Sequence, residues 1–227
     1  MLVYLIEYIR SCPKHPRILD AGCGLGSHAI FLSLLGADVV GIDLSKERLD
    51  VANKRVKYYQ EKYPMILHPR FYYKNVLKSC ELGEFDIIWA NQSISHIHPV
   101  ENFLYVAWRK LNNGYLIICD SNGMNPYVAF EAWLVHRKGG LYELKKDPDT
   151  GELIPYARER MLNPIYLRAL LSKSNYKVQL TEYHGFVPPK FHTKRLFRFI
   201  ERVMTNMPFF RLTGGSYIIV GKKSICN

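Results

Sequence analysis

Two aspartates and three glycines near the start of the chain have a spacing that suits the binding of a nucleoside. Asp20 precedes a turn that contains Gly22, Gly24 and Gly26, and Asp43 follows further along. Glycine has no Cβ, so such a turn can bend tightly and bring the backbone against a ligand. A carboxylate at Asp43 can accept hydrogen bonds from ribose hydroxyls. The pattern therefore predicts a nucleoside site.

The charge of Asp20 and the residue at position 27 indicate which kind of nucleoside binds. A dinucleotide-binding turn has the pattern Gly-x-Gly-x-x-Gly, so that the start of the helix can face a pyrophosphate. In this chain Ser27 stands at the third glycine position of that pattern. Asp20 would repel a pyrophosphate but would attract an ammonium or sulfonium group. The turn therefore favours a nucleoside that carries a positive charge.

A strand–turn–helix–strand unit is needed to hold these residues in place. The residues from Arg17 to Asp20 are typical of a short strand buried on both faces. A helix follows the glycines and is expected to end at Gly36, which suits a left-handed residue. Residues 39–42 predict a second strand that carries Asp43 at its carboxyl end. Ligands bind at this edge of open parallel sheets, outside the strand ends.

Further strands and helices alternate along the chain. The expected helices are Ser45–Tyr63, Pro99–Leu111, 128–137, Pro164–Ser174 and a basic helix within 186–213. Ser45 is the expected N-cap of the first of these and Pro64 its stop, and residues 112–114 are expected to end the second. The expected strands are 70–73, 85–90, 115–120, 176–183 and 217–220. Right-handed crossovers between such elements predict an α/β fold, with a doubly wound, mostly parallel sheet and helices on both faces. Residues 1–227 are expected to form one domain.

The motif Asp20-Ala-Gly-Cys-Gly-Leu-Gly26, with Asp43, resembles the cofactor motif of the class I S-adenosylmethionine-dependent methyltransferases. The similarity extends from about Arg17 to Asp120. It implies a Rossmann-like sheet of seven strands, with the last strand antiparallel between the fifth and sixth. It also implies S-adenosylmethionine as cofactor and S-adenosylhomocysteine as product, without a metal.

The same resemblance assigns roles to individual residues. It implies that Asp20 orients the methionine amino group, that Asp43 holds the ribose hydroxyls and that Leu44 packs on the adenine. The other cofactor-binding residues that it implies are Ala21, Gly22, Cys23, Gly24, Asn75, Val76 and Asn91. The family usually has an acidic residue where this chain has Asn75. An amide can still accept from the adenine amine, although an ordinary turn asparagine is the alternative.

His96 and His98 follow the fourth expected strand, where methyl donor and acceptor would meet, and are the candidate catalytic residues. Histidine has the pKa range of a general base, which is needed only if the acceptor must lose a proton. The alternative for both is a structural role in the loop. Their spacing could also suit a metal, but the chain supplies no third ligand, so metal dependence is not expected.

The loop sequence ANQSIS, residues 90–95, restricts the acceptor. Enzymes of this family that methylate exocyclic base amines have an Asn/Asp-Pro-Pro-aromatic loop there, and cytosine-C5 enzymes have a Pro-Cys pair, which is also missing. We therefore expect a small molecule, or a lipid- or sugar-linked metabolite, as acceptor of a methyl group on oxygen, nitrogen or carbon. An RNA methyltransferase and a non-catalytic binding module are the alternatives.

The formal charge of +11 predicts attraction to an anionic partner: an anionic acceptor, a lipid surface or, less favoured, nucleic acid. An insertion at 121–160 is expected to cover the acceptor site. Its candidate contact residues are Trp133, His136, Arg137, Tyr142 and Tyr156. The basic-aromatic segment 186–213 suits either peripheral membrane contact or packing on the sheet. Residues 1–16 predict an amphipathic helix, and a cytoplasmic protein with or without membrane contact is expected.

Overall fold

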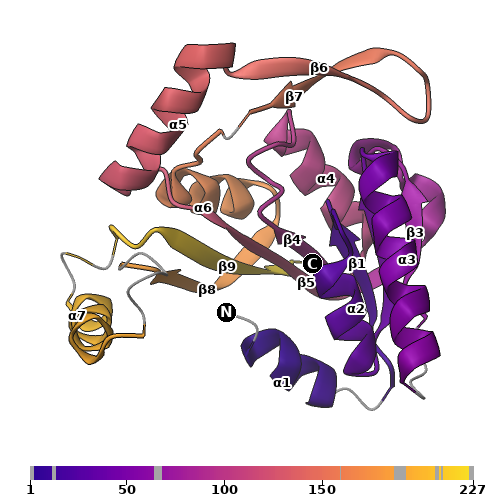
Figure 1. Ribbon diagram of the computed structural model, residues 1–227, viewed down its shortest axis with the longest axis horizontal. Helices are drawn as coiled ribbons and strands as arrows, with labels where there is room; N and C mark the ends of the chain where they lie inside the picture. Colours follow the sequence, from indigo (N-terminus) through magenta and orange to yellow (C-terminus); the bar gives the residue numbers. More distant parts are fainter. Residues whose placement is uncertain are drawn as a thin grey trace.

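The computed structural model describes residues 3–11, 14–63, 68–158, 160–186, 193–207, 210 and 212–224. A seven-stranded sheet forms its centre (Figure 1). The strands of this sheet are β1 (Arg17–Ala21), β2 (Asp38–Asp43), β3 (Arg70–Tyr73), β4 (Phe85–Asn91), β5 (Leu111–Ser121), β8 (Tyr176–His184) and β9 (Ser216–Lys223). The α-helices are α1 (Val3–Ser11), α2 (Ser27–Leu34), α3 (Lys46–Lys62), α4 (Val100–Lys110), α5 (Pro126–Gly139), α6 (Pro164–Lys173) and α7 (Arg195–Asn206).

The strand order is β3-β2-β1-β4-β5-β9-β8. Neighbouring strands from β3 to β5 are parallel, whereas β9 is antiparallel to both β5 and β8. The last strand thus lies between the fifth and sixth strands of the sheet, which confirms the expected fold. Parallel strands place the carboxyl ends of β1, β2 and β4 at one edge, where the chemistry-bearing residues gather.

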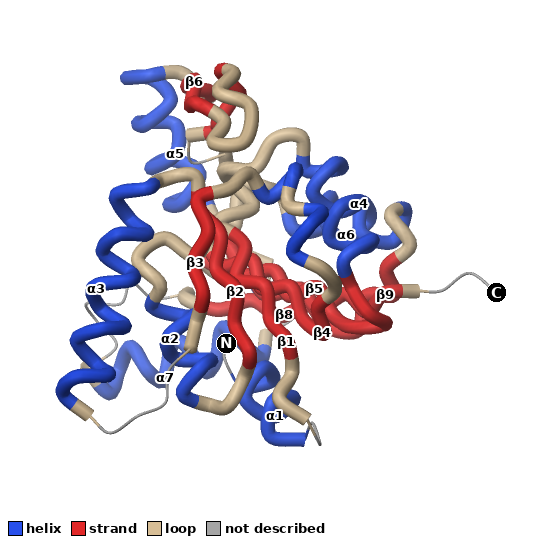
Figure 2. The backbone as a smooth tube through the Cα atoms, turned by 90° about the vertical axis from the view of Figure 1, so that its right-hand side faces the viewer, coloured by secondary structure: helices blue, strands red, loops and turns tan. Residues whose placement is uncertain are grey.

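Helices cover both faces of the sheet (Figure 2). One core lies between the sheet and α4 with α6, and includes Phe103 and Leu167. The other lies between the sheet and α1 with α2, and includes Leu5 and Leu32. Trp89 of β4 is completely buried in this second core. Because both faces are covered, the parallel strands are apolar almost throughout, as the sequence indicated.

Capping residues set several helix boundaries as the sequence predicted. Ser45 is the N-cap of α3, and its Oγ accepts a hydrogen bond from the Arg48 N–H at 3.2 Å. Gly36 follows α2 with φ of 95°, the left-handed conformation expected there. The helix α3 ends at Lys62, and the predicted stop at Pro64 lies outside the described residues.

The helix α4 ends as expected, with Leu111 as its C-cap, but the next strand begins earlier than the predicted Tyr115. The helix ends at Lys110, and β5 already begins at Leu111, which pairs with Phe85. The segment 112–114 is therefore an irregularity within β5 rather than a loop, and the register shifts at this point. Gly114 is required there, because an added Cβ would lie 1.9 Å from the Asp86 carbonyl oxygen.

The insertion contains a β-hairpin that was not predicted, although its turn at 147–151 was. Strand β6 (Tyr142–Lys146) pairs antiparallel with β7 (Leu153–Ala157) and forms a separate two-stranded sheet. Figure 1 shows this hairpin above the edge at which the parallel strands end. Within the described part of the chain, no helix is long and apolar enough to cross a membrane.

Candidate functional site

The glycine turn after β1 is fixed to the end of β2. The N–H groups of Gly22 and Cys23 both donate to the Ile42 carbonyl oxygen, at 2.8 and 3.0 Å. Gly22 has φ of 79°, and a Cβ there would lie 2.6 Å from the Cβ of Ser93 in the loop after β4. The turn therefore needs glycine both for its backbone conformation and for this close approach.

Asp43 is held at the carboxyl end of β2 by two backbone groups. Its Oδ2 accepts from the Gly24 N–H and its Oδ1 from the Ser45 N–H, both at 2.8 Å. The carboxylate is half-buried and faces the pocket described below. Each oxygen keeps a second lone pair, so Asp43 can still accept hydrogen bonds from a ligand.

Asp20 is a buried acid, only 2% exposed, at the carboxyl end of β1. Its Oδ2 has no hydrogen-bond partner among the described residues. Burial, together with the negative charge of Asp43, raises the pKa of Asp20 to about 7. A ligand with a positive charge would stabilise the ionised form of this carboxylate, so the residues present fit the cationic cofactor that the sequence implied.

A pocket opens beside Asp43, whereas Asp20 is not among its lining residues. The residues that line it are Gly22, Ile42, Asp43, Leu44, Arg48, Lys74, Val76, Gln92, Ser93, His96, Ile97, Lys145 and Tyr156. They come from the ends of β1 and β2, the first turn of α3, the loops after β3 and β4, and the β6–β7 hairpin. The pocket lining thus combines one acid, Asp43, with basic, polar and apolar side chains.

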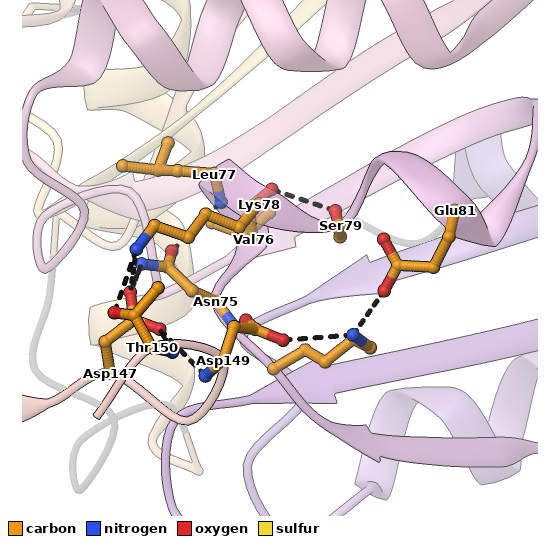
Figure 3. Close-up of polar contacts among 10 residues, drawn as sticks. Asn75, Val76, Leu77, Lys78, Ser79, Glu81, Asp147, Asp149 and Thr150 are labelled. Atoms are coloured by element: carbon orange, nitrogen blue, oxygen red, sulfur yellow. Dashed lines mark hydrogen bonds and ion pairs between the residues drawn. The ribbon is translucent and has the colours of Figure 1, made fainter. Parts of the chain in front are cut away.

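Hydrogen bonds and ion pairs join the turn of the hairpin to the loop after β3 (Figure 3). This contact lies on one side of the pocket. Asn75 donates from Nδ2 to Oδ2 of Asp147 at 2.8 Å, and Lys78 Nζ lies 3.0 Å from the same oxygen. Asn75 Oδ1 accepts from the Leu77 N–H at 3.0 Å. Both ends of the Asn75 amide are therefore engaged within the chain, and its contact with adenine stays a prediction.

On the hairpin side, Asp147 and Asp149 make these contacts. Asp147 is completely buried, and burial alone would raise its pKa, but hydrogen bonds from Asn75, Lys78 and two backbone N–H groups outweigh burial and hold the pKa at about 2. Asp149 lies 3.0 Å from Lys74 Nζ, which also pairs with Glu81. The hairpin is thus attached through charged hydrogen bonds, which are stronger than neutral ones.

His96 lies in the pocket wall under the hairpin. Its Nδ1 is 2.8 Å from the Ala157 carbonyl oxygen, so this nitrogen carries the proton and Nε2 carries the ring lone pair. The ring stacks on Tyr156, with centroids 5.0 Å apart and planes 7° apart. Lys145 Nζ lies 3.3 Å from the centroid of that Tyr156 ring. His96 is therefore fixed in one tautomer and one orientation.

His98 is placed differently from His96. Its Nδ1 lies 3.1 Å from Nη1 of Arg160, whose Nη2 donates to the Ile97 carbonyl oxygen at 2.7 Å. The ring lies 5.1 Å from that of Tyr142. His98 is not among the residues that line the pocket. The geometry favours a role in holding the loop, and a catalytic role for His98 stays a prediction.

Most insertion residues expected at the acceptor site lie elsewhere. Only Tyr156 lines the pocket; Trp133 is half exposed on α5, and His136 Nε2 is 2.7 Å from the Arg158 carbonyl oxygen. Asn122 is buried and donates from Nδ2 to the carbonyl oxygens of Leu212 and Gly214. These residues connect α5 and the 212–214 segment to the fold.

Asn91 and three residues of the pocket wall complete the description of the site. Asn91 Oδ1 is buried without a partner among the described residues, as a ligand-binding group would be, while its Nδ2 is 3.5 Å from His28 Nδ1. Gln92, Ser93 and Lys145 line the pocket but were not predicted. Gln92 has φ of 51°, which is unusual for a residue with a side chain. Such backbone strain is common at functional sites, but it is seen in the structure and not in the sequence.

The described part of the site supplies neither a reactive thiol nor a group of metal-binding side chains. Burial, with the charges of Asp20 and Asp43, raises the pKa of the Cys23 thiol above its ordinary value, so it is no nucleophile. Among the described residues, no group of three His, Cys, Asp or Glu side chains is placed to hold a metal ion. The acids and the glycine turn are thus the features of this site that a ligand would use.

Comparison with known proteins places the glycine turn within a known domain. Residues 19–119 match the family described as a methyltransferase domain. The chain is 30% identical over 156 residues to a ubiquinone biosynthesis O-methyltransferase of Ruegeria, which covers 66% of this chain and 61% of the relative. It is 32% identical over 94 residues to a magnesium-protoporphyrin O-methyltransferase of Rhodobacter capsulatus, covering 41% and 38%. The chain thus spans about three fifths or less of these relatives.

Solved structures share the fold. The crystal structure of magnesium protoporphyrin IX methyltransferase from Synechocystis with bound SAH superposes with a TM-score of 0.62 at 16% identity, covering 97% of this chain and 80% of that one. A methyltransferase structure from Methanosarcina mazei gives 0.64 at 17% identity, covering 97% and 98%. The seven-stranded arrangement with its antiparallel β9 is therefore that of a known fold.

Proposed function

We propose that the chain is a class I S-adenosylmethionine-dependent methyltransferase and that it transfers a methyl group from S-adenosylmethionine to an oxygen atom of a small molecule. The observation that carries this proposal is the pair of acids at the ends of β1 and β2. Asp20 is buried with an unpartnered oxygen and a pKa of about 7, so the site lacks the positive charge that would stabilise its ionised form.

Four residues would hold the cofactor. Asp20 offsets the positive charge of its methionine end, and Asp43 accepts from the ribose hydroxyls through the lone pairs left by Gly24 and Ser45. Leu44 and Val76 supply apolar contact for the adenine at the same end of the pocket. When bound, S-adenosylmethionine supplies an activated methyl group on a sulfonium. Gly22 keeps the turn close to Ser93 and leaves no Cβ between backbone and ligand.

The acceptor would lie beside Ser93, His96 and Tyr156, where the pocket passes under the hairpin. Methyl transfer is an in-line displacement, and holding the acceptor near and aligned provides much of the acceleration. A hydroxyl acceptor also has to lose a proton. The Ala157 carbonyl oxygen fixes the proton of His96 on Nδ1, which makes Nε2 the basic nitrogen of a general base.

The class of acceptor rests on the relatives and on the pocket wall. By their names, one relative is a ubiquinone biosynthesis O-methyltransferase and the other is a magnesium-protoporphyrin O-methyltransferase. Arg48, Lys74 and Lys145 line the pocket together with Ile97. This combination supports an acceptor with an apolar body and a hydroxyl or carboxylate group, and it leaves a lipid-linked metabolite within the proposed class.

Transfer of a labelled methyl group tests this proposal. The full chain is incubated with methyl-labelled S-adenosylmethionine and three acceptors: a hydroxylated benzoate with an apolar tail, the same ring without the tail, and a carboxylated porphyrin. We expect label in at least one acceptor, as a base-stable ether or a base-labile ester, and none with Asp20→Asn. Cofactor binding without transfer to any acceptor or cell extract would instead support the non-catalytic alternative. Label in RNA alone would support the RNA alternative.

A further inference from the structure

The helix α7 presents an apolar stripe to solvent. Leu196 and Phe199 are each 64% exposed, and Val203 on the same face is also exposed. Residues three and four apart share a face of a helix, so these side chains form one stripe, which the exposed Met207 and Phe210 continue beyond its end. Large apolar side chains gathered on one exposed face indicate an interaction site rather than ordinary surface.

The inner face of α7 fixes which way this stripe points. Phe197, Ile200 and Met204 are half-buried on the opposite side of the helix. Glu201 on that side accepts with Oε1 from the N–H groups of Gly185 and Phe186, at 2.9 and 3.2 Å. The helix is therefore attached to the end of β8 through one face, and its apolar stripe is directed outward.

A row of arginines runs beside the stripe. Arg195, Arg198 and Arg202 are exposed, and with Phe199 they line a shallow surface hollow. None of the three forms an ion pair with another described residue. An apolar stripe flanked by unpaired basic side chains is the arrangement of a helix that lies in the plane of an anionic membrane surface.

The helix α5 lies on the other side of the ends of β8 and β9 from α7 (Figure 1). Its Phe130 and Trp133 are half exposed and stack with centroids 5.8 Å apart. The N-cap of α5, Asn125, donates to the Thr213 carbonyl oxygen at 2.6 Å, which ties α5 to the segment that follows α7. Phe and Trp on the apolar side are typical of interfacial helices.

We propose that the outer face of α7, formed by Leu196, Phe199 and Val203 beside Arg195, Arg198 and Arg202, binds the headgroup region of an anionic lipid bilayer. The arginines attract the headgroups, and the stripe enters the boundary with the acyl chains. A nucleic acid would use the arginines but not the aliphatic side chains. The stripe therefore favours the membrane. This proposal does not depend on methyl transfer.

Vesicle sedimentation with the full chain tests the proposal. We expect the protein to sediment with vesicles of phosphatidylcholine and phosphatidylglycerol, less so as salt rises, and to stay in solution with phosphatidylcholine alone. Arg198→Glu with Arg202→Glu should weaken binding at least about 30-fold, and Leu196→Ser with Phe199→Ser should also weaken it strongly. Lys54→Glu with Lys57→Glu on α3 makes the same charge change on another exposed surface and should leave binding close to the native level.

Three results would overturn the proposal. One is a failure of the native protein to bind anionic vesicles. Another is equal weakening by the α3 variant, which would mean that net charge alone drives binding. The third is evidence that the α7 face binds something else. Sedimentation velocity would show a dimer that Leu196→Ser with Phe199→Ser dissociates, or RNA retention would show RNA binding that only the arginine variant removes. Thermal unfolding confirms that each variant is folded.

Discussion

Asn75 donates a hydrogen bond from Nδ2 to Oδ2 of Asp147, 2.8 Å away, and this buried contact joins the loop after β3 to the turn of the β6–β7 hairpin. The hairpin carries Lys145 and Tyr156 into the pocket wall and positions His96 through Ala157. A contact remote from the reacting atoms thus controls the shape of the site.

Replacing Asp147 by Asn should detach the hairpin turn. The variant loses the ion pair with Lys78 and can place an amide NH2 against that of Asn75, so a buried group loses its partner. We expect a loss of about 2 kcal/mol in the free energy of unfolding and a cofactor Kd about tenfold higher. Urea unfolding and calorimetric titration measure the two effects. Glu152→Gln removes the same charge from an exposed site in this hairpin and should change neither.

The pKa of Asp20 predicts a proton release on cofactor binding. At pH 6 an acid with a pKa of about 7 is mostly protonated, and a bound cation ionises it, so nearly one proton should leave. Because this pKa lies above the ordinary value, stability without ligand falls as pH rises from about 4 to 7. Titration in two buffers of different ionisation enthalpy counts the protons. Equal proton release by the native protein and Asp20→Asn would contradict this assignment.

Gly22→Ala should be far more harmful than Gly24→Ala. A Cβ at Gly22 would lie 2.6 Å from that of Ser93, whereas a Cβ at Gly24 meets nothing within 4 Å, and both glycines have positive φ. We expect losses of about 3 kcal/mol and about 1 kcal/mol in the free energy of unfolding, respectively. Gly22→Ala should also abolish cofactor binding. Similar losses in the two variants would show that the approach of Ser93 does not matter.

His96→Asn separates a catalytic from a structural role. The Asn amide can keep the hydrogen bond to the Ala157 carbonyl oxygen but cannot take a proton. We expect kcat to fall about 10²- to 10⁴-fold with cofactor Kd unchanged. A variant that keeps the native kcat would leave His96 with a structural role only.

Local patterns predicted the cofactor side of the site, whereas contacts between distant segments formed the rest. The glycine turn, Asp20 and Asp43 are set by one strand–turn–helix–strand unit, and Ser45 caps α3 as its type predicts. The hairpin was missed because its alternation is inverted: Leu144 and Leu153 face solvent at 66% and 65% exposure, while Lys145 turns toward the pocket.

Contacts between distant segments also explain two other differences between the predicted and the observed structure. The extension of β5 to Leu111 depends on pairing with Phe85, which no local signal near 112–114 shows. The engagement of the Asn75 amide depends on Asp147, a residue that comes close only when the insertion folds back over the sheet. Pairing between distant segments overrides local propensity in both cases.

Titration calorimetry with S-adenosylmethionine tests whether Asp20 and Asp43 hold a cationic nucleoside. We expect one binding site per native chain, and a large loss of affinity in Asp43→Ala with the fold retained in far-UV circular dichroism. Adenosine diphosphate, which brings a pyrophosphate toward Asp20, should not bind. Absence of S-adenosylmethionine binding by the folded native chain, or equal affinity in Asp43→Ala, would show that the two aspartates do not hold such a ligand.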